Sequence, residues 1–450
     1  MSIRLAILVG LIFSISHLGA QQNKPLVDSV ALLQAQQLQQ TAKSIAYSSN
    51  HPGAQWFPKA GLGLFIHWGM TAVTGTGDLS WSMLANKSWK DATITPNNYY
   101  ALANEWKPEK MDFDKMLKAA KAAGITYAVF VTKHHDGFTL WPSQYGEKGT
   151  KFQFGGRDFV KEFVTACRKY NIRVGLYFSP PDWYFERQYK NFSFHSKVQL
   201  DMNHQPTVLP KRTPEFEQKR IEYIQNQVTE LLTQYGKIDL IWFDGGKGEI
   251  PNKVVRELQP GIVINRRNGG MGDYGDSEGA LPKKRFEGWF ETCETAWPSK
   301  KWSYIADTSW DSATDVITEL VKLRAWGGNL LANVGPKASG EIPEQALTAW
   351  REMATWMKRN KESVIGTNAG PWPADVNTPV TTRKGVAYIH LLPGEKQTIV
   401  WKNAPKPIKV FLLQSKKKVA FTYENGVLQV SLPDALRTNQ VDVVKLIIQE

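Results

Sequence analysis

Between residues 56 and 365 the sequence alternates between short apolar runs and longer amphipathic segments, and this alternation limits the fold more than any other feature. The apolar runs are predicted strands at 63–69, 173–179, 238–242, 261–267, 289–293 and 329–334, and 125–138 is a further predicted strand with its exit loop. Amphipathic segments with helical spacing include 113–123, 159–170, 221–232, 313–326 and 343–360. Strands separated by helices form a parallel sheet, and this length suits an irregular (β/α)8 barrel. A doubly wound open sheet is the alternative, but no Gly-x-Gly-x-x-Gly follows the first strand.

After about residue 365 the pattern changes to short apolar runs separated by turn signals. These runs lie at 386–392, 398–401, 408–413, 419–423, 427–432 and 441–448. Asn425-Gly426 between two of them is a strong hairpin signal. We therefore predict an antiparallel β-sandwich at 366–450. It would follow a barrel domain at 50–365 and a polar, glutamine-rich tether or helix at 21–49.

The first twenty residues are typical of a secretory signal. Arg4 precedes an apolar run at 5–13, and Leu18-Gly19-Ala20 supplies small residues for cleavage after Ala20. We therefore expect an exported protein, periplasmic or secreted, with no later stretch apolar enough to cross a membrane. The two cysteines, Cys167 and Cys293, are predicted to be free buried thiols, because a large core does not need a disulfide.

The formal net charge of +13 suggests anionic partners. Lysine and arginine are dispersed apart from short clusters such as Lys416-Lys417-Lys418, so the composition does not favour nucleic-acid binding. An acidic or sulfated glycan is a better explanation in an exported protein. The 17 tryptophans point the same way, because indole rings stack on the apolar faces of sugars.

The predicted strand at 238–242 runs almost directly into Asp244, which is followed by two glycines. In a (β/α)8 barrel the active site lies at the carboxyl ends of the strands. The polar residues at those predicted ends are His67, His134, His135, Asp136, Tyr177, Asp182, Asp244, Asn265, Arg266 and Arg267. They could bind sugar hydroxyls around one acid. A metal site at 134–136 is the alternative, but adjacent strand residues point to opposite sides and no His-x-x-x-His spacing occurs, so we predict no metal.

Six ordered motifs resemble the α-L-fucosidases of glycoside hydrolase family 29. They are Phe65-Ile-His-Trp-Gly69, Thr132-Lys-His-His-Asp-Gly-Phe138, Gly175-Leu-Tyr-Phe-Ser179, Asp239-Leu-Ile-Trp-Phe-Asp-Gly-Gly246, Trp289-Phe-Glu-Thr-Cys293 and Asn329-Leu-Leu-Ala-Asn-Val-Gly-Pro336. The resemblance covers roughly residues 50 to 365, and the C-terminal sandwich also suits that family. It implies a retaining exo-glycosidase that needs no metal or organic cofactor.

The resemblance also implies roles for single residues. Asp244 is similar to the family's nucleophile, and Trp302 to the aromatic side chain that faces the methyl group of fucose. The residues that would hold the sugar hydroxyls and the nucleophile are His67, His134, His135, Tyr177, Trp242 and Arg267. Neutral histidines suit hydroxyls, because each ring offers one donor and one acceptor.

The second carboxyl group, which acts as acid and base, is harder to assign. Many family members carry a Thr-Pro-Glu-Tyr segment where this chain has 272–282, and this places Glu278 in the acid/base position on a mobile, glycine-rich loop. Glu291 is the main alternative. Asp276, Glu287 and Glu294 are weaker ones.

Two departures from the family pattern bear on the substrate. Leu79-Ser-Trp-Ser-Met83 stands where many relatives have Glu-Trp-Tyr, so an acidic contact to the sugar is lost while Trp81 remains as a predicted sugar contact. Asn265-Arg-Arg-Asn-Gly269 stands where relatives often have Asn-Asp-Arg-Trp-Gly. The added arginine favours a sulfated or acidic substrate.

Three functions are consistent with these residues. The first is hydrolysis of terminal α-L-fucosyl residues by double displacement through a covalent fucosyl-enzyme. The second is the same reaction on a related sugar, α-L-galactose or a sulfated fucose, although Trp302 would leave the extra hydroxyl of galactose unpaired. The third is a non-catalytic fucose-binding protein on the same fold. The sequence does not predict the oligomeric state.

Overall fold

The computed structural model describes residues 47–85, 94–194, 197–394 and 398–449. The predicted signal peptide at 1–20 and most of the tether at 21–49 lie outside the described residues. Among the described residues, no helix is both long and apolar enough to cross a membrane.

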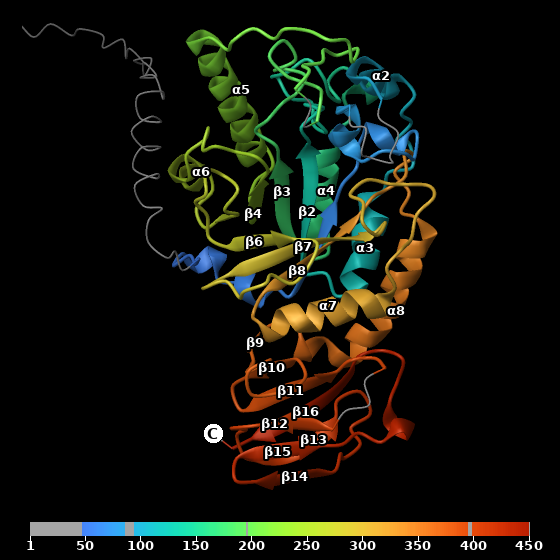
Figure 1. Ribbon diagram of the computed structural model, residues 1–450, viewed down its shortest axis with the longest axis vertical. Coiled ribbons are helices and arrows are strands. Elements are labelled where there is room, and N and C mark those ends of the chain that lie inside the picture. The colour runs from blue at the N-terminus through green and yellow to red at the C-terminus, as the bar shows by residue number, and fades with distance from the viewer. Residues whose placement is uncertain (1–46, 86–93, 195–196, 395–397, 450) are drawn as a thin grey trace, which may run out of the picture.

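Eight parallel strands form one curled sheet with the order β5-β4-β3-β2-β1-β8-β7-β6 (Figure 1). Their bounds are β1 Leu62–Ile66, β2 Tyr127–Lys133, β3 Arg173–Phe178, β4 Leu240–Phe243, β5 Val263–Ile264, β6 Gly275–Glu278, β7 Phe290–Trp297 and β8 Asn329–Val334. The two edge strands approach each other through a single parallel bridge between Asn265 and Tyr274. The strands thus follow each other around a barrel in sequence order, as the alternating pattern predicts.

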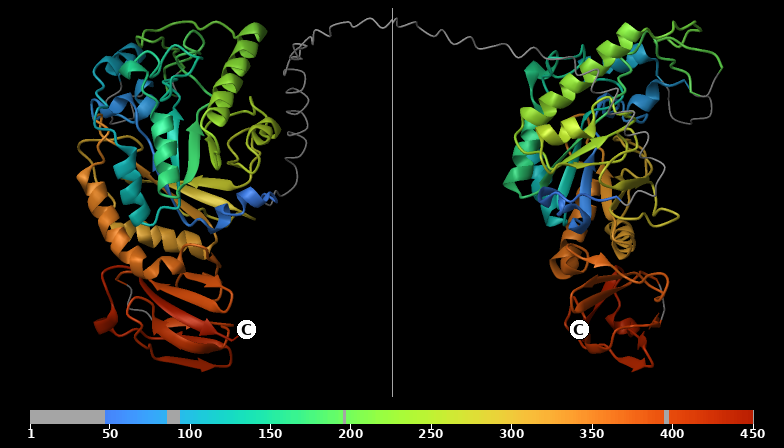
Figure 2. Two further views of the ribbon diagram at one scale, coloured as in Figure 1. Left: turned by 180° about the vertical axis from the view of Figure 1, so that it is seen from behind. Right: turned by 90° about the vertical axis from the view of Figure 1, so that its left-hand side faces the viewer.

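Seven α-helices lie in the described chain, and most cover the outside of the sheet (Figure 2). They are α2 Pro96–Ala101, α3 Phe113–Ala122, α4 Phe159–Lys169, α5 Pro214–Thr233, α6 Asn252–Leu258, α7 Ala313–Ala325 and α8 Glu344–Asn360. The described residues between β5 and β6, and between β6 and β7, contain no helix. The missing helices make the barrel irregular. Without a helix between β5 and β6, the residues that follow β5 lie close to β6.

Local sequence explains where the barrel elements begin and end. Helix α4 starts at Asp158, whose side chain accepts the backbone N–H of Lys161, and it turns Phe159 and Phe163 into the core. Strand β4 is buried along its whole length and is followed by Gly245, whose φ of +79° lies in the left-handed region. The chain therefore turns sharply just after Asp244.

Strand β6 differs from the sequence prediction. The sequence predicts Glu278 on a mobile loop, whereas in the structure it ends a strand whose four residues pair with Phe290 to Cys293 of β7. The sequence Gly-Asp-Ser-Glu has no β-branched or aromatic residue to signal a strand. Gly275 is required there because the ring of Phe286 packs where a side chain would begin. Pairing with β7, rather than local propensity, therefore forms this strand.

The barrel interior is filled by side chains at alternate positions along the strands. The packed interior set consists of Phe65, Tyr127, Val129, Val131, Tyr177, Leu240, Trp242, Val263, Tyr274, Cys293 and Leu331, with Ala54, Phe57 and Ala60. Alternate residues such as Ile241 and Phe243 instead pack outward against the helices. Cys167 and Cys293 are both buried and free, as predicted.

The C-terminal region forms two antiparallel sheets that pack as a β-sandwich. The strands are β9 Asn368–Ala369, β10 Val380–Arg383, β11 Val386–Leu391, β12 Ile399–Trp401, β13 Pro407–Leu412, β14 Phe421–Glu424, β15 Val427–Val430 and β16 Asp442–Ile448. The sheet orders are β13-β16-β11-β10-β9 and β12-β15-β14, and one apolar cluster lies between them. Asn425 and Gly426 join β14 to β15 with φ values of 49° and 77°, which confirms the predicted hairpin.

The sandwich packs against α7 and α8, at the lower end of Figure 1. The Trp356 indole of α8 donates to the Val441 carbonyl at 2.8 Å, and Lys445 pairs with Glu362 at 2.9 Å. The contact lies on the helices around the barrel and leaves the carboxyl ends of the strands uncovered.

Candidate active site

A cavity of about 350 Å³ opens at the carboxyl ends of the barrel strands. Its lining consists of Phe65, His67, Trp81, His134, His135, Tyr177, Pro181, Trp183, Trp242, Asp244, Gly245, Arg267, Glu278, Cys293 and Trp302. All eight predicted sugar-binding residues are in this set, together with Asp244 and Glu278. The volume lies at the small end of the range for ligand pockets, about 300–1,000 Å³.

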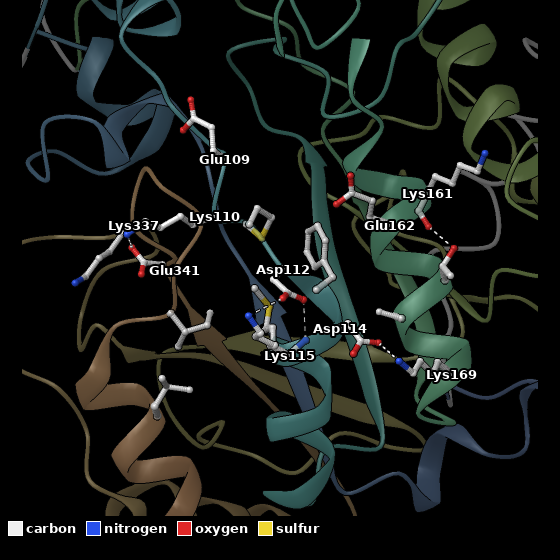
Figure 3. A pocket seen from close by; sticks show the side chains of 18 of the residues that line it. Glu109, Lys110, Asp112, Asp114, Lys115, Lys161, Glu162, Lys169, Lys337 and Glu341 are labelled. Atoms are coloured by element: carbon white, nitrogen blue, oxygen red, sulfur yellow. Dashed lines mark hydrogen bonds and ion pairs between the residues drawn. The ribbon is translucent and has the colours of Figure 1, made fainter. Parts of the chain in front are cut away.

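A larger hollow of about 1010 Å³ lies on the outer surface, beside α3, α4 and α8 (Figure 3). Its charged side chains pair with one another: Lys110 with Glu341 at 3.2 Å, and Lys169 with Asp114 at 2.6 Å. Such pairs neutralise the rim. The chemically distinctive residues are therefore in the smaller cavity.

Asp244 is held in place through both carboxylate oxygens. The Tyr177 hydroxyl donates to Oδ2 at 2.9 Å, and Nη1 of Arg267 donates to Oδ1 at 3.1 Å. Nε2 of His135 lies 3.6 Å from Oδ2. The Asn265 amide bonds both backbone groups of Phe243, the preceding residue, at 2.9 and 2.8 Å. These contacts fix the carboxylate at the end of β4.

Arg267 links three carboxylates with three different nitrogens. Besides Nη1 on Asp244, its Nε donates to Asp276 at 2.7 Å and its Nη2 to Glu278 at 3.1 Å. The guanidinium also lies over the Trp242 ring, 4.5 Å from the centroid. One cation thus sits between the two acids that line the cavity, and Asp276 beneath fixes its orientation.

The three cavity histidines are neutral at physiological pH. Burial lowers the pKa of His67 and of His135 to about 4, and it lowers that of His134 well below the ordinary value. Nδ1 of His67 contacts Oδ1 of Asn333 at 2.7 Å, and Nδ1 of His135 contacts the Ser179 hydroxyl at 2.6 Å. The rings therefore meet a ligand as uncharged hydrogen-bonding groups.

Aromatic side chains form the walls of the cavity. The backbone N–H of Trp302 donates to Asp78 at 3.1 Å, and the Trp302 ring lies 4.8 Å from the His67 ring. On the other side, Trp183 stacks on His135 at 5.3 Å, and Trp81 meets His135 edge-on at 5.4 Å. Indole faces beside hydroxyl-binding groups match the amphipathic faces of a sugar ring.

The two acid/base alternatives occupy different environments. Glu278 lines the cavity with a half-exposed side chain, whereas Glu291 is fully buried in the barrel interior. Glu291 accepts hydrogen bonds from Trp242, Tyr127 and Tyr274. Burial raises the pKa of Glu291 to about 7. The weaker alternatives do not line the cavity: Asp276, Glu287 and Glu294.

Among the described residues, one group could hold a metal ion: the donor atoms of His134, His135 and Asp244 lie within 4.8 Å of one another. Both oxygens of Asp244 already accept hydrogen bonds, and the positive charge of Arg267 lies beside them. Nearby positive charge disfavours a cation. The ring nitrogens of His134 and His135 and the carboxylate of Asp244 are better suited to hydrogen bonds with sugar hydroxyls than to a metal ion.

Other predicted strand-end residues support the site without lining it. Asp136 accepts the Tyr99 hydroxyl at 2.5 Å, and Asp182 pairs with the buried Lys133 at 3.4 Å. Arg266 directs Nε and Nη2 to the carboxylate and the backbone carbonyl of Asp276 at 3.1 and 2.8 Å. The charge of Arg266 is thus already paired outside the cavity.

Several residues that hold the site together are not among those that the sequence patterns single out. They are Asp78, Ser80, Ser179, Trp183 and Asn333. Asn333 belongs to the motif at 329–336, so its place near the end of β8 can be read from the sequence. Ser179 likewise ends the motif at 175–179, directly after β3. Nothing local distinguished Asp78 or Trp183.

A (β/α)8 barrel with one carboxylate at the end of β4, a second on β6, and histidines and indoles between them defines a glycoside hydrolase. The comparisons with known proteins give the family. The model of the α-L-fucosidase family matches residues 27–362. The chain belongs to the α-L-fucosidase family, as the six motifs indicated.

Individual relatives agree over most of the chain. Mouse tissue α-L-fucosidase is 28% identical over 428 residues, which cover 85% of this chain and 88% of the relative. The solved α-L-fucosidase isoenzyme 1 from Paenibacillus thiaminolyticus has a TM-score of 0.78 and 29% identity, covering 89% of this chain and 99% of that one. A solved family 29 α-L-fucosidase from Bacteroides thetaiotaomicron has a TM-score of 0.76 and 25% identity, covering 90% and 98%.

Proposed function

We propose that this protein hydrolyses terminal α-L-fucosyl residues from glycans with retention of anomeric configuration, Asp244 being the nucleophile and Glu278 the acid/base. The observation that carries the proposal is that one guanidinium, that of Arg267, bonds both carboxylates at the mouth of a cavity of monosaccharide scale. A retaining glycosidase needs two carboxyl groups on opposite sides of the scissile bond.

In the first step the Asp244 carboxylate attacks the anomeric carbon while the bond to the leaving oxygen breaks. Glu278 gives its proton to that oxygen, which leaves as an alcohol, and a β-linked fucosyl-enzyme ester forms. The bonds from Tyr177 and Arg267 keep one Asp244 lone pair direction fixed toward the sugar. Holding the nucleophile before the reaction lowers the entropic barrier.

In the second step the Glu278 carboxylate takes a proton from water, and the water oxygen attacks the anomeric carbon. The ester to Asp244 breaks and α-L-fucose is released, with Glu278 protonated again. A half-exposed position suits Glu278 for this role, because it must exchange protons with the leaving alcohol and with water.

Three observations bear on the related-sugar alternatives. Trp302 is held on the cavity wall by Asp78, and an aromatic wall favours the methyl group of fucose over the hydroxymethyl group of α-L-galactose. Arg266, the added arginine, is engaged by Asp276 outside the cavity, which weakens the argument for a sulfated sugar. The two acids in the cavity would also repel a sulfate.

We also propose that the protein is exported to the periplasm or beyond the cell. The support is the pattern of Arg4, the apolar run at 5–13 and the small residues before Gln21. Mass spectrometry of the protein purified from its natural host tests this. A mature chain beginning at Gln21 supports export, and an intact Met1 terminus in the cytoplasmic fraction contradicts it.

The test of the reaction is proton NMR during cleavage of 4-nitrophenyl α-L-fucoside. A retaining fucosidase releases α-L-fucose first, before mutarotation, whereas first release of the β-anomer contradicts the mechanism. A fucose-binding protein without activity would bind L-fucose yet release no nitrophenol. If kcat/KM is higher on the matching α-L-galactoside or on a sulfated fucoside than on the α-L-fucoside, that sugar is the substrate instead of fucose.

A further inference from the structure

We infer that Asn333 and Ser179 are positioning residues that set the tautomers of His67 and His135, so that each ring presents an unprotonated Nε2 to the substrate. This inference rests on the proposed function for its substrate, and it deepens that proposal. It requires a sugar that donates hydrogen bonds through two free hydroxyls.

Asn333 connects the His67 ring to the backbone of Trp302 through two hydrogen bonds. Nδ2 of Asn333 donates to the Trp302 backbone carbonyl at 2.7 Å, and a carbonyl can only accept. The amide orientation is therefore fixed, and Oδ1 of Asn333 must be the atom that faces Nδ1 of His67 at 2.7 Å. Because Oδ1 is an acceptor, Nδ1 of His67 must carry the proton, and Nε2 is left with a lone pair.

The tautomer of His135 is set in the same way, by the Ser179 hydroxyl instead of an amide. The Ser179 hydroxyl donates its only proton to the Pro181 carbonyl at 2.8 Å. It therefore accepts at its contact of 2.6 Å with Nδ1 of His135, which must carry the proton. Nε2 of His135, the atom 3.6 Å from Asp244, is left as an acceptor.

Burial makes these assignments matter for binding. Asn333 and Ser179 are completely buried, and His67 and His135 are nearly so, hence water does not exchange freely for the missing bonds. The lowered pKa values of both histidines keep the rings neutral. Tyr177 and Arg267 already donate to the Asp244 carboxylate, so the unprotonated Nε2 of His135 is the acceptor that lacks a donor. A sugar hydroxyl supplies that donor.

Asn333 has a second consequence, because it contacts two cavity residues at once. The same amide that orients the His67 ring also holds the carbonyl of Trp302, whose ring packs 4.8 Å from that of His67. A change at Asn333 should therefore alter hydroxyl recognition and the aromatic wall together.

The direct test is long-range proton–nitrogen NMR of the full-length protein labelled with 15N-histidine, with signals assigned by the loss of each peak in His67→Gln and His135→Gln. We expect protonated Nδ1 and bare Nε2 in both rings. A proton on Nε2 of either ring overturns the inference. This reading needs no turnover, so it stays informative even if the protein proves not to hydrolyse fucosides.

The kinetic test is Asn333→Asp, which keeps an acceptor for His67 but adds a negative charge. The titratable groups that face His67 are Asp244, His134, His135 and Tyr177. The new carboxylate should raise the His67 pKa toward its ordinary value of about 6.5. At pH 5 only about one His67 ring in thirty would then be neutral. For this variant, kcat/KM on an aryl fucoside at pH 5 should therefore be about thirtyfold below its own value at neutral pH.

Asn329→Asp is the matched control, because Asn329 is equally buried at the opposite end of the same strand and, within the described chain, its side chain bonds Gly61, Phe57 and Arg324 rather than a cavity residue. It should leave the acidic limb of the pH profile in place. An unshifted acidic limb in folded Asn333→Asp would refute the positioning role. A variant that does not fold leaves the NMR result on the wild-type protein to decide.

Discussion

Replacing Glu291 by glutamine should make the protein relatively more stable as the pH rises. Glu291 is enclosed in the barrel interior, where Trp242, Tyr127 and Tyr274 direct hydrogen-bond donors at it. No described cation pairs with its carboxylate. Burial therefore favours the protonated acid and raises its pKa from 4.5 to about 7.

The raised pKa of Glu291 determines how the unfolding free energy of the wild-type protein changes with pH. The folded state binds the proton more tightly than the unfolded state, so the stabilisation is complete below about pH 4.5 and is lost as the pH rises to 7. At about 1.4 kcal/mol for each pH unit, the loss amounts to about 3 kcal/mol. Glutamine does not titrate and nearly preserves the shape. The difference in unfolding free energy between Glu291→Gln and wild type should thus move by about 3 kcal/mol in favour of glutamine between pH 4.5 and pH 8.

Urea unfolding followed by tryptophan fluorescence at these two pH values measures the effect. Glu352→Gln, an exposed change on α8, is the control and should show no comparable change with pH. A stability difference for Glu291→Gln that stays constant, or that moves in favour of wild type at pH 8, would refute the reasoning. It would mean that the Glu291 carboxylate is ionised in the folded protein despite its burial.

Three further predictions concern the cavity. Arg267→Lys should lower kcat/KM on an aryl fucoside about a hundredfold, roughly the worth of one charged hydrogen bond, because a single ammonium cannot contact both Asp244 and Glu278 in the same way; unchanged kinetics would contradict the bridging role. Binding of L-fucose, measured by calorimetry, should weaken below about pH 4, where His67 and His135 become charged and lose their acceptor atoms; binding that strengthens on acidification would be contrary evidence. Dialysis against a chelator should leave kcat/KM within about twofold, and a loss restored by a divalent ion would instead support the metal alternative.

The parts of the fold that sequence patterns predict are those whose signals are local. Strand β4 is an apolar run of four buried residues, and α4 has its cap and its apolar stripe within a dozen residues. The hairpin at Asn425-Gly426 is similar, because two residues determine the turn. Asp244 was found for the same reason, as an acid placed directly at a strand end.

The parts that the sequence did not predict depend on distant partners. Strand β6 forms because it pairs with β7, and its own four residues favour no strand. The orientation of His67 depends on Asn333, 266 residues away in sequence. The bridge made by Arg267 was likewise visible only after β5 and β6 came together. Hydrogen bonds of this kind follow from tertiary geometry, which periodicity does not encode.

The anomeric configuration of azide products tests directly whether Asp244 is the nucleophile and Glu278 the acid/base. With an activated fucoside and azide, Glu278→Ala should still form the fucosyl-enzyme and should yield α-L-fucosyl azide by attack on that intermediate. Asp244→Ala cannot form it, and azide should enter from the opposite face of the sugar to give the β-azide. Proton NMR distinguishes the two products. A β-azide from Glu278→Ala, or rescue of Glu291→Ala instead, would contradict the assignment of the catalytic pair.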